Sequence, residues 1–105
     1  MTSPDAGTAL QRALCVNFVN FAGTVGVELA SRPWASITFS GARHRLVLRI
    51  AGAGAAAAAD AFLDGLEGRE FALRGHILAD IVVVREVREP GGVRLTLEAL
   101  TVESG

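Results

Sequence analysis

Residues 77–102, ILADIVVVREVREPGGVRLTLEALTV, decide the fold. The stretch 77–87 is rich in β-branched and apolar residues, which is typical of a β-strand. EPGG at 89–92 supplies a turn, and 93–102 alternate apolar and polar side chains as a half-buried strand does. The sequence therefore predicts an antiparallel hairpin here, with a bulge or twist at 99–100, where the alternation breaks.

The strand at 77–87 is apolar on both faces if its side chains alternate strictly. One face then holds Ile77, Ala79, Ile81 and Val83, and the other holds Leu78, Val82 and Val84. Such a strand needs cover on both faces, and a chain of 105 residues has no spare element for a second layer. A second copy is the simplest cover, because two-fold homodimers are the commonest oligomers. The alternative is that long arginine stems shield the outer face.

The N-terminal part predicts one long helix over 6–29. Its apolar side chains recur at helical spacing: Leu10, Leu14, Phe18, Phe21, Val25 and Leu29. Ser3 or Asp5 is expected to cap its start. Gly23 and Gly26 weaken its second half, and Pro33 disfavours helical backbone at the residue before it. Trp34 then marks the passage from helix to sheet.

Two further elements are predicted from 36 to 68. The stretches 36–40 and 45–50 alternate in polarity about Gly41-Ala42, which predicts a first hairpin. A glycine turn at 52–54 precedes an alanine-rich helix that ends at Gly65 or Gly68. Phe71 and Leu73 are expected to begin the next strand.

The predicted order is α-β-β-α-β-β over a single domain, residues 1–105. The predicted fold class is α+β, a two-layer sandwich with an antiparallel four-stranded sheet and two helices on one face. This order of elements resembles a circularly permuted ferredoxin-like plait. The resemblance covers the order of elements only, so it implies no function.

Composition excludes several function classes. The formal net charge is −1 and there is no lysine, so neither a basic nucleic-acid surface nor a polybasic membrane segment is expected. The abundance of Ala, Gly, Arg and Val suggests a GC-rich bacterial genome. One cysteine and no apparent signal peptide favour the cytoplasm. No segment has eighteen consecutive apolar residues.

Residues 52–57, GAGAAA, fit the dinucleotide-binding pattern G-x-G-x-x-A between a strand and a helix. The preceding strand belongs to a hairpin and the chain is too short for a Rossmann domain, so no cofactor is expected. An anion at this helix start, beside Arg45 or Arg49, stays possible. Two distant histidines and one cysteine do not predict a metal site.

Five polar residues are candidates for binding a small anionic ligand: Asp80, His76, His44, Arg43 and Arg45. Asp80 interrupts an apolar strand, which favours either a buried ion pair or a site residue with a perturbed pKa. His76 lies on the same predicted strand face, too far along the strand for direct contact. Arg43 and Arg45 flank His44 and could hold a carboxylate or phosphate, or they form a solvated hairpin end.

Two functions fit these observations. The first is a non-enzymatic interaction or assembly domain that acts as a homodimer, which the doubly apolar strand and the missing catalytic pattern favour. The second is a small-molecule binding protein or small enzyme, with a pocket between helix and sheet or between subunits around Asp80, His76 and His44. The second requires several of these groups to converge within hydrogen-bond reach.

Overall fold

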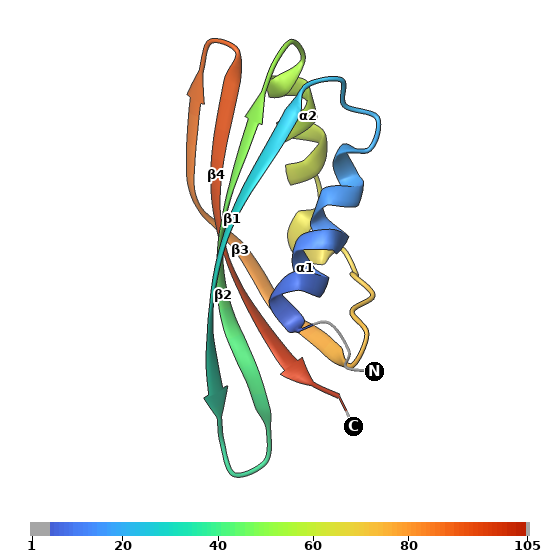
Figure 1. Cartoon of the computed structure of the whole chain (residues 1–105), viewed down its shortest axis with the longest axis vertical. Helices are drawn as coiled ribbons and strands as arrows, with labels where there is room; N and C mark the ends of the chain where they lie inside the picture. Colours follow the sequence, from blue (N-terminus) through green and yellow to red (C-terminus); the bar gives the residue numbers. More distant parts are fainter. Residues whose placement is uncertain (1–4, 105) are drawn as a thin grey trace.

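The framework of the computed structural model, which describes residues 5–104, is a four-stranded antiparallel sheet with two helices on one face (Figure 1). In chain order the elements are α1 (Ala6–Cys15), the 3-10 turn η1 (Val16–Phe18), β1 (Thr24–Ala35), β2 (Ser40–Ala51), α2 (Ala55–Leu63), the 3-10 turn η2 (Leu66–Gly68), β3 (His76–Glu89) and β4 (Gly92–Glu103). Hairpins β1–β2 and β3–β4 join through β2 and β4, so the strand order is β1-β2-β4-β3. The predicted fold class is confirmed.

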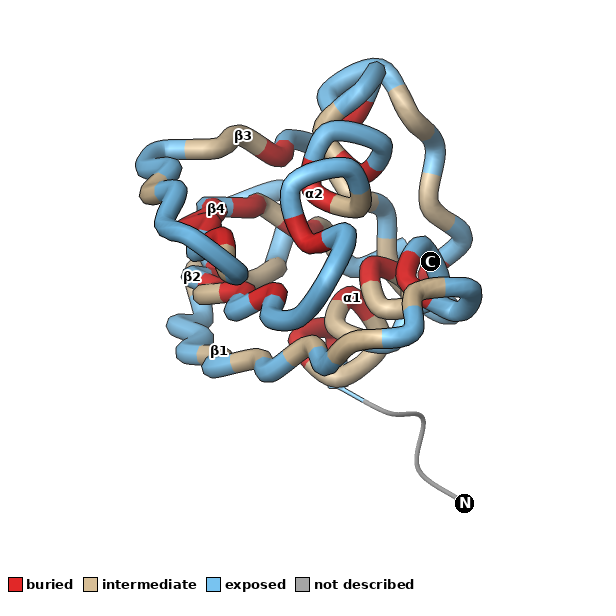
Figure 2. The backbone as a smooth tube through the Cα atoms, turned by 90° about the horizontal axis from the view of Figure 1, so that it is seen from above, coloured by how far each residue is buried: buried red, intermediate tan, exposed pale blue. Residues whose placement is uncertain are grey.

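The core lies between the helices and the inner face of the sheet. Alternation along the central strands β2 and β4 directs every second side chain toward the helices. Among the most deeply buried side chains are Leu10, Leu14, Leu46, Leu48, Ile50, Phe62, Leu95 and Leu97. The Phe18 and Phe62 rings, 5.1 Å apart between centroids, join η1 to α2. Figure 2 shows the same distribution, with buried segments in the central strands and on the inner turns of the helices.

The predicted helix over 6–29 is wrong beyond Cys15. Asp5 caps α1 as predicted, its Oδ1 accepting a hydrogen bond from the Thr8 amide at 2.7 Å, while Ser3 lies outside the described residues. Residues 24–35 form β1, whose inward side chains follow a period of two rather than 3.6. Gly26 disfavours a helix here, and the β-branched valines of this stretch favour extended backbone, so together they outweigh the helical spacing.

The first hairpin turns at 36–39, not at Gly41-Ala42. Ser36 closes the turn: its amide donates to the Phe39 carbonyl at 2.7 Å, and its Oγ accepts from the Phe39 amide at 3.0 Å. Serine hydroxyls commonly stabilise turns in this way. Gly41 lies in β2 opposite Trp34. The predicted strand 36–40 is therefore mostly the hairpin tip.

The second half follows its prediction more closely. Gly54, with a φ of 83°, precedes α2, and Gly65, with a φ of 68°, follows its end. Residues 69–75, which we call the connector, link η2 to β3 without regular structure, so Phe71 does not begin a strand; Leu73 forms only an isolated bridge with His76. The turn at 89–92 and β4 are confirmed.

The predicted faces of β3 are wrong because the strand contains two register shifts. Ala79 is an extra residue between the pairs Leu78–Thr101 and Asp80–Leu100. Val84 is an extra residue between the pairs Val83–Leu97 and Arg85–Thr96. Each bulge exchanges the faces that follow it. Leu78 therefore packs against the core and Val82 lies on the outer face. A bulge was expected in β4 at 99–100. The structure has it in the neighbouring strand β3, at Ala79, opposite Leu100 and Thr101.

Candidate functional site

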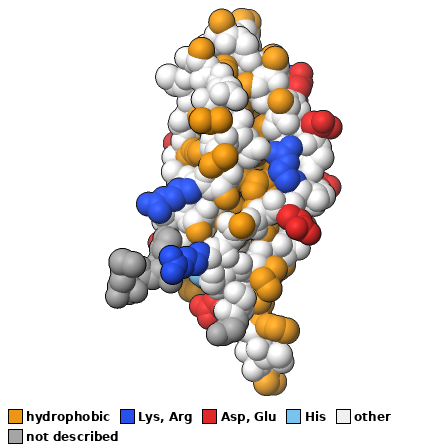
Figure 3. Space-filling model, turned by 90° about the vertical axis from the view of Figure 1, so that its right-hand side faces the viewer, with side chains coloured by type: hydrophobic (Ala, Val, Ile, Leu, Met, Phe, Trp, Pro, Cys, Tyr) orange, Lys and Arg blue, Asp and Glu red, His pale blue; other side chains and the backbone are white. Residues whose placement is uncertain are grey.

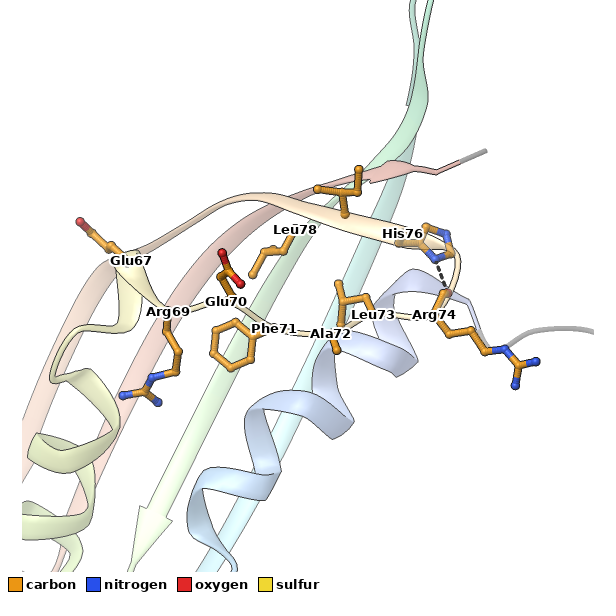
Figure 4. Close-up of a pocket in the computed structure, with 11 residues that line it drawn as sticks. Glu67, Arg69, Glu70, Phe71, Ala72, Leu73, Arg74, His76 and Leu78 are labelled. Atoms are coloured by element: carbon orange, nitrogen blue, oxygen red, sulfur yellow. Dashed lines mark hydrogen bonds between the residues drawn. The ribbon is translucent and has the colours of Figure 1, made fainter.

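A large hollow lies between the connector and β3 (Figure 4). We call it the connector pocket; its volume is about 710 Å³ and it opens to solvent. Phe71, Ala72, Leu73, Ile77 and Leu78 supply its apolar lining. In Figure 4, Leu73 and Leu78 point into the space between the two segments. A volume in the range of roughly 300–1,000 Å³ is typical of binding sites.

Charged and polar side chains surround this apolar lining. They are Glu67, Arg69, Glu70, Arg74 and His76. Arg69 is held in place, since its guanidinium donates to Asn17 Oδ1 and to the Asp64 carbonyl, both at 2.6 Å. His76 is one of the predicted ligand residues, and its Nδ1 lies 3.1 Å from the Arg74 carbonyl. The connector pocket thus combines an apolar floor with a rim of both charges.

His44 lies in the interior, which contradicts the alternative that residues 43–45 form only a solvated hairpin end. Its side chain is 3% exposed, with Nδ1 2.8 Å from Ser31 Oγ and Nε2 2.9 Å from Thr101 Oγ1. Thr101 donates its own proton to the Ala42 carbonyl at 3.4 Å, so Nε2–H donates to Thr101 and Nδ1 accepts from Ser31. Burial lowers the pKa of His44, and the nearby charge of Asp5 opposes that shift.

Arg43 and Arg45 lie on the outer face of the sheet, opposite to His44 as predicted. Arg43 pairs directly across strands with Arg32, and together with Arg45 and Glu98 they line a depression of about 390 Å³. Like charges directly opposite each other destabilise a sheet. Among the ion pairs found in residues 5–104, none involves these three arginines. The outer-face depression therefore holds three arginines and one carboxylate, that of Glu98, which lies directly opposite Arg45.

Asp80 and His76 do not share a face, which corrects the prediction. The bulge at Ala79 sends Asp80 to the outer face and leaves His76 at the connector pocket. Asp80 is exposed, so the ion pair expected of a buried acid is not required. A shallow hollow of about 120 Å³ brings Asp80 and Arg43 to one surface. The five candidates thus separate into an outer group, an interior histidine and a pocket-rim histidine.

The helix start after Gly54 is also not beside Arg45 or Arg49. Gly52 donates a hydrogen bond to the Gly91 carbonyl at 2.9 Å, so this turn lies against the β3–β4 turn. Arg49 lies on the outer face, where it forms an ion pair with Glu28. The anion site expected from this neighbourhood is therefore not formed by those arginines.

The exposed hairpin tip, residues 36–39, was not predicted from the sequence. The Ile37 side chain has 106% of its reference exposure and that of Phe39 has 55%. Figure 3 shows apolar side chains at the narrow lower end of the molecule, where this hairpin projects. Alternating polarity at 36–40 suggested a strand. The signal against it was Ser36, which is suited to a turn, three residues before Phe39.

Between residues 5 and 104, no helix has the length and apolar character needed to cross a membrane. In the same range, no three His, Cys, Asp or Glu side chains gather as a metal site would require.

No protein-family model and no curated protein matches the sequence. The fold is similar to that of a chain in the solved structure "Virion of native gene transfer agent (GTA) particle". The two chains superimpose with a TM-score of 0.60 over 95% of this chain and 96% of the other, at 22% sequence identity. At that identity the comparison establishes a shared fold.

Proposed function

We propose that this protein is a non-enzymatic assembly subunit that binds further copies of itself, with a homodimer as the smallest assembly. One observation carries the proposal: the β1–β2 hairpin presents Ile37 and Phe39 to solvent at its tip. A large apolar side chain at a fully exposed turn has no role in the core, and exposed apolar clusters mark interaction sites. The lone Cys15 is consistent with a reducing bacterial cytoplasm as the place of action.

Three further observations support an assembly role. The polar groups that an enzyme would need to bring together do not converge, because Asp80 lies on the outer face of the sheet while His44 is buried on the inner face and His76 lies at the connector pocket. The fold is shared with a chain of a gene transfer agent virion, and we extend to this protein the idea of a structural role in a particle. Outer strands β1 and β3 also have free hydrogen-bonding edges that further chains can meet.

Sedimentation velocity of the full chain from about 5 to 500 µM tests this function, since contacts between copies depend on concentration. We expect the weight-average mass to rise from that of the 10.9 kDa monomer to twice that mass or more. A monomer over the whole concentration range would refute self-association.

Binding of a small anion is a second candidate function, favoured by the Arg32–Arg43 pair beside Arg45 in the outer-face depression. Arginine forks bind carboxylates and phosphates in a bidentate manner. Inorganic phosphate or citrate would then raise the melting temperature of the native protein, and Arg43→Gln would remove the effect. Equal stabilisation of native and variant protein would rule out this site.

A further inference from the structure

We propose that the connector pocket is the receptor for the hairpin tip of another copy of the chain. This inference rests on the proposed self-association and names its contact: residues 36–39 of one copy seat between the connector and β3 of the next. It joins the exposed apolar tip of the β1–β2 hairpin to the apolar lining of the connector pocket.

Shape is the first argument. The last pair between β1 and β2 is Ala35 with Ser40, and the last pair between β2 and β4 is Gly41 with Val102. The tip lies beyond both pairs, so no neighbouring strand flanks it. It is narrow, and its hydrogen bonds through Ser36 hold it in one conformation. A preformed projection loses little entropy on docking. The pocket, at about 710 Å³, is large enough for the side chains of Ile37 and Phe39.

Polarity is the second argument. The four tip residues are uncharged, and the pocket floor offers Phe71, Ala72 and Leu73. Ile77 lies at the same pocket and is 58% exposed in the isolated chain. Docking the tip would remove apolar surface from water on both partners, which is the main driving force of association. A polar ligand would gain less from this floor.

Charge is the third argument, and it favours a second copy as the occupant. Arg32 and Arg43 lie four to five residues behind the tip, roughly 13–17 Å along the strands. Glu67 and Glu70 stand on the pocket rim. Within the described part of the chain, these four side chains form no ion pair. The same rim carries Arg69 and Arg74, so opposite charges meet only where Arg32 and Arg43 approach the two glutamates, and this selects one orientation of the docked tip.

The contact has two different halves, so each can be damaged alone. Ile37→Asp places a charge at the tip, and Ala72→Arg fills the pocket from an exposed position outside the core. Val19→Asp is the matched control, because Val19 is 77% exposed in a loop and belongs to neither half. Circular dichroism and thermal unfolding verify that all three variants fold.

Sedimentation velocity of each variant, and of a mixture, tests the contact. We expect Ile37→Asp and Ala72→Arg each to weaken self-association by roughly ten- to hundredfold, the effect of losing one buried apolar anchor, with Val19→Asp unchanged. Mixed together, the two defective chains should form a 1:1 complex, because one retains a pocket and the other a tip.

The possible results separate this inference from the proposed function. If the native chain associates and Ala72→Arg associates equally well, the tip binds elsewhere and the pocket assignment is wrong. If both variants fail and the mixture also fails, the tip and the pocket do not meet. If the native chain stays monomeric, the proposed self-association is wrong, and the proposed contact is wrong as well.

Discussion

At the scale of single residues, His44 combines burial with ionisable chemistry. Its two ring nitrogens bind Ser31 and Thr101, and both bonds suit the neutral ring. The carboxylate of Asp5, at the start of α1, favours the charged ring, and the charge of His76 on β3 disfavours it. Burial outweighs Asp5, so the pKa of His44 lies below its ordinary value of 6.5. His44 therefore links stability to pH.

The sign of this link follows from the direction of the shift. Below about pH 6.5 the unfolded chain binds a proton at His44 that the folded chain does not, so the free energy of unfolding falls as the pH falls toward the lowered pKa. The slope has a limit of about 1.4 kcal/mol per pH unit for one proton. Urea unfolding between pH 7.5 and 5.5 measures it.

His44→Gln serves as the comparison for this prediction. Glutamine retains donor and acceptor groups but does not titrate in this range. The variant should show a flatter dependence on pH than the native protein between pH 7.5 and 5.5. Identical slopes in both proteins would mean that His44 does not control acid stability.

The placement of His44 is a case where sequence reasoning succeeded in part. Alternation along 43–50 correctly put His44 on the face opposite to Arg43 and Arg45. It could not show that this face is the buried one at that point, because Ser31 and Thr101 come from strands distant in the chain. Partners of a buried polar group depend on strand register, which a single sequence specifies weakly.

At the scale of elements, Gly41 shows why the first hairpin was misplaced. Glycine there suggested a turn, but its φ is not in the left-handed region. A Cβ at Gly41 would overlap the Thr101 carbonyl oxygen and lie 3.0 Å from Trp34 Nε1. Glycine is therefore required for close packing beneath the Trp34 indole, not for a turn.

A substitution at this position tests the assignment. Gly41→Ala should lower the free energy of unfolding by about 2 kcal/mol or more, because the clash is with backbone. Gly26→Ala is the matched control, since Gly26 lies in β1 with no atom within 4 Å of the added carbon. It should be neutral or slightly stabilising. Urea unfolding of the two variants gives the comparison, and equal stabilities would contradict this packing.

Strand β3 shows a second limit of what can be predicted from the sequence. Its existence and its hairpin with β4 followed from composition and the turn at 89–92. Its faces did not, because a bulge is one extra residue with no obligatory sequence signature. Ala79 and Val84 are ordinary strand residues, yet they separate Leu78 from Val82 and Asp80 from His76. Because Leu78 packs against the core of its own chain, β3 does not require a covering partner, and the basis for self-association is the exposed hairpin tip.

At the scale of the whole molecule, the hairpin tip and the connector pocket lie on different parts of one elongated chain, which is 47 Å along its longest axis. The β1–β2 tip lies at one end, and the connector, which lines the pocket, runs on the helix-covered side of the sheet (Figure 1). Two copies exchanging tips would form a two-fold dimer with both contacts repeated. Copies joined in one direction only would form a ring or a chain.

The most direct measurement of the central claim is a dilution series of amide spectra, recorded by NMR on the ¹⁵N-labelled native chain. If the hairpin tip binds the connector pocket of a second copy, the amide signals of residues 36–39 and 67–78 will shift together with concentration and with a single affinity. Shifts confined to the outer face of the sheet, or to the tip without the connector, would contradict the account.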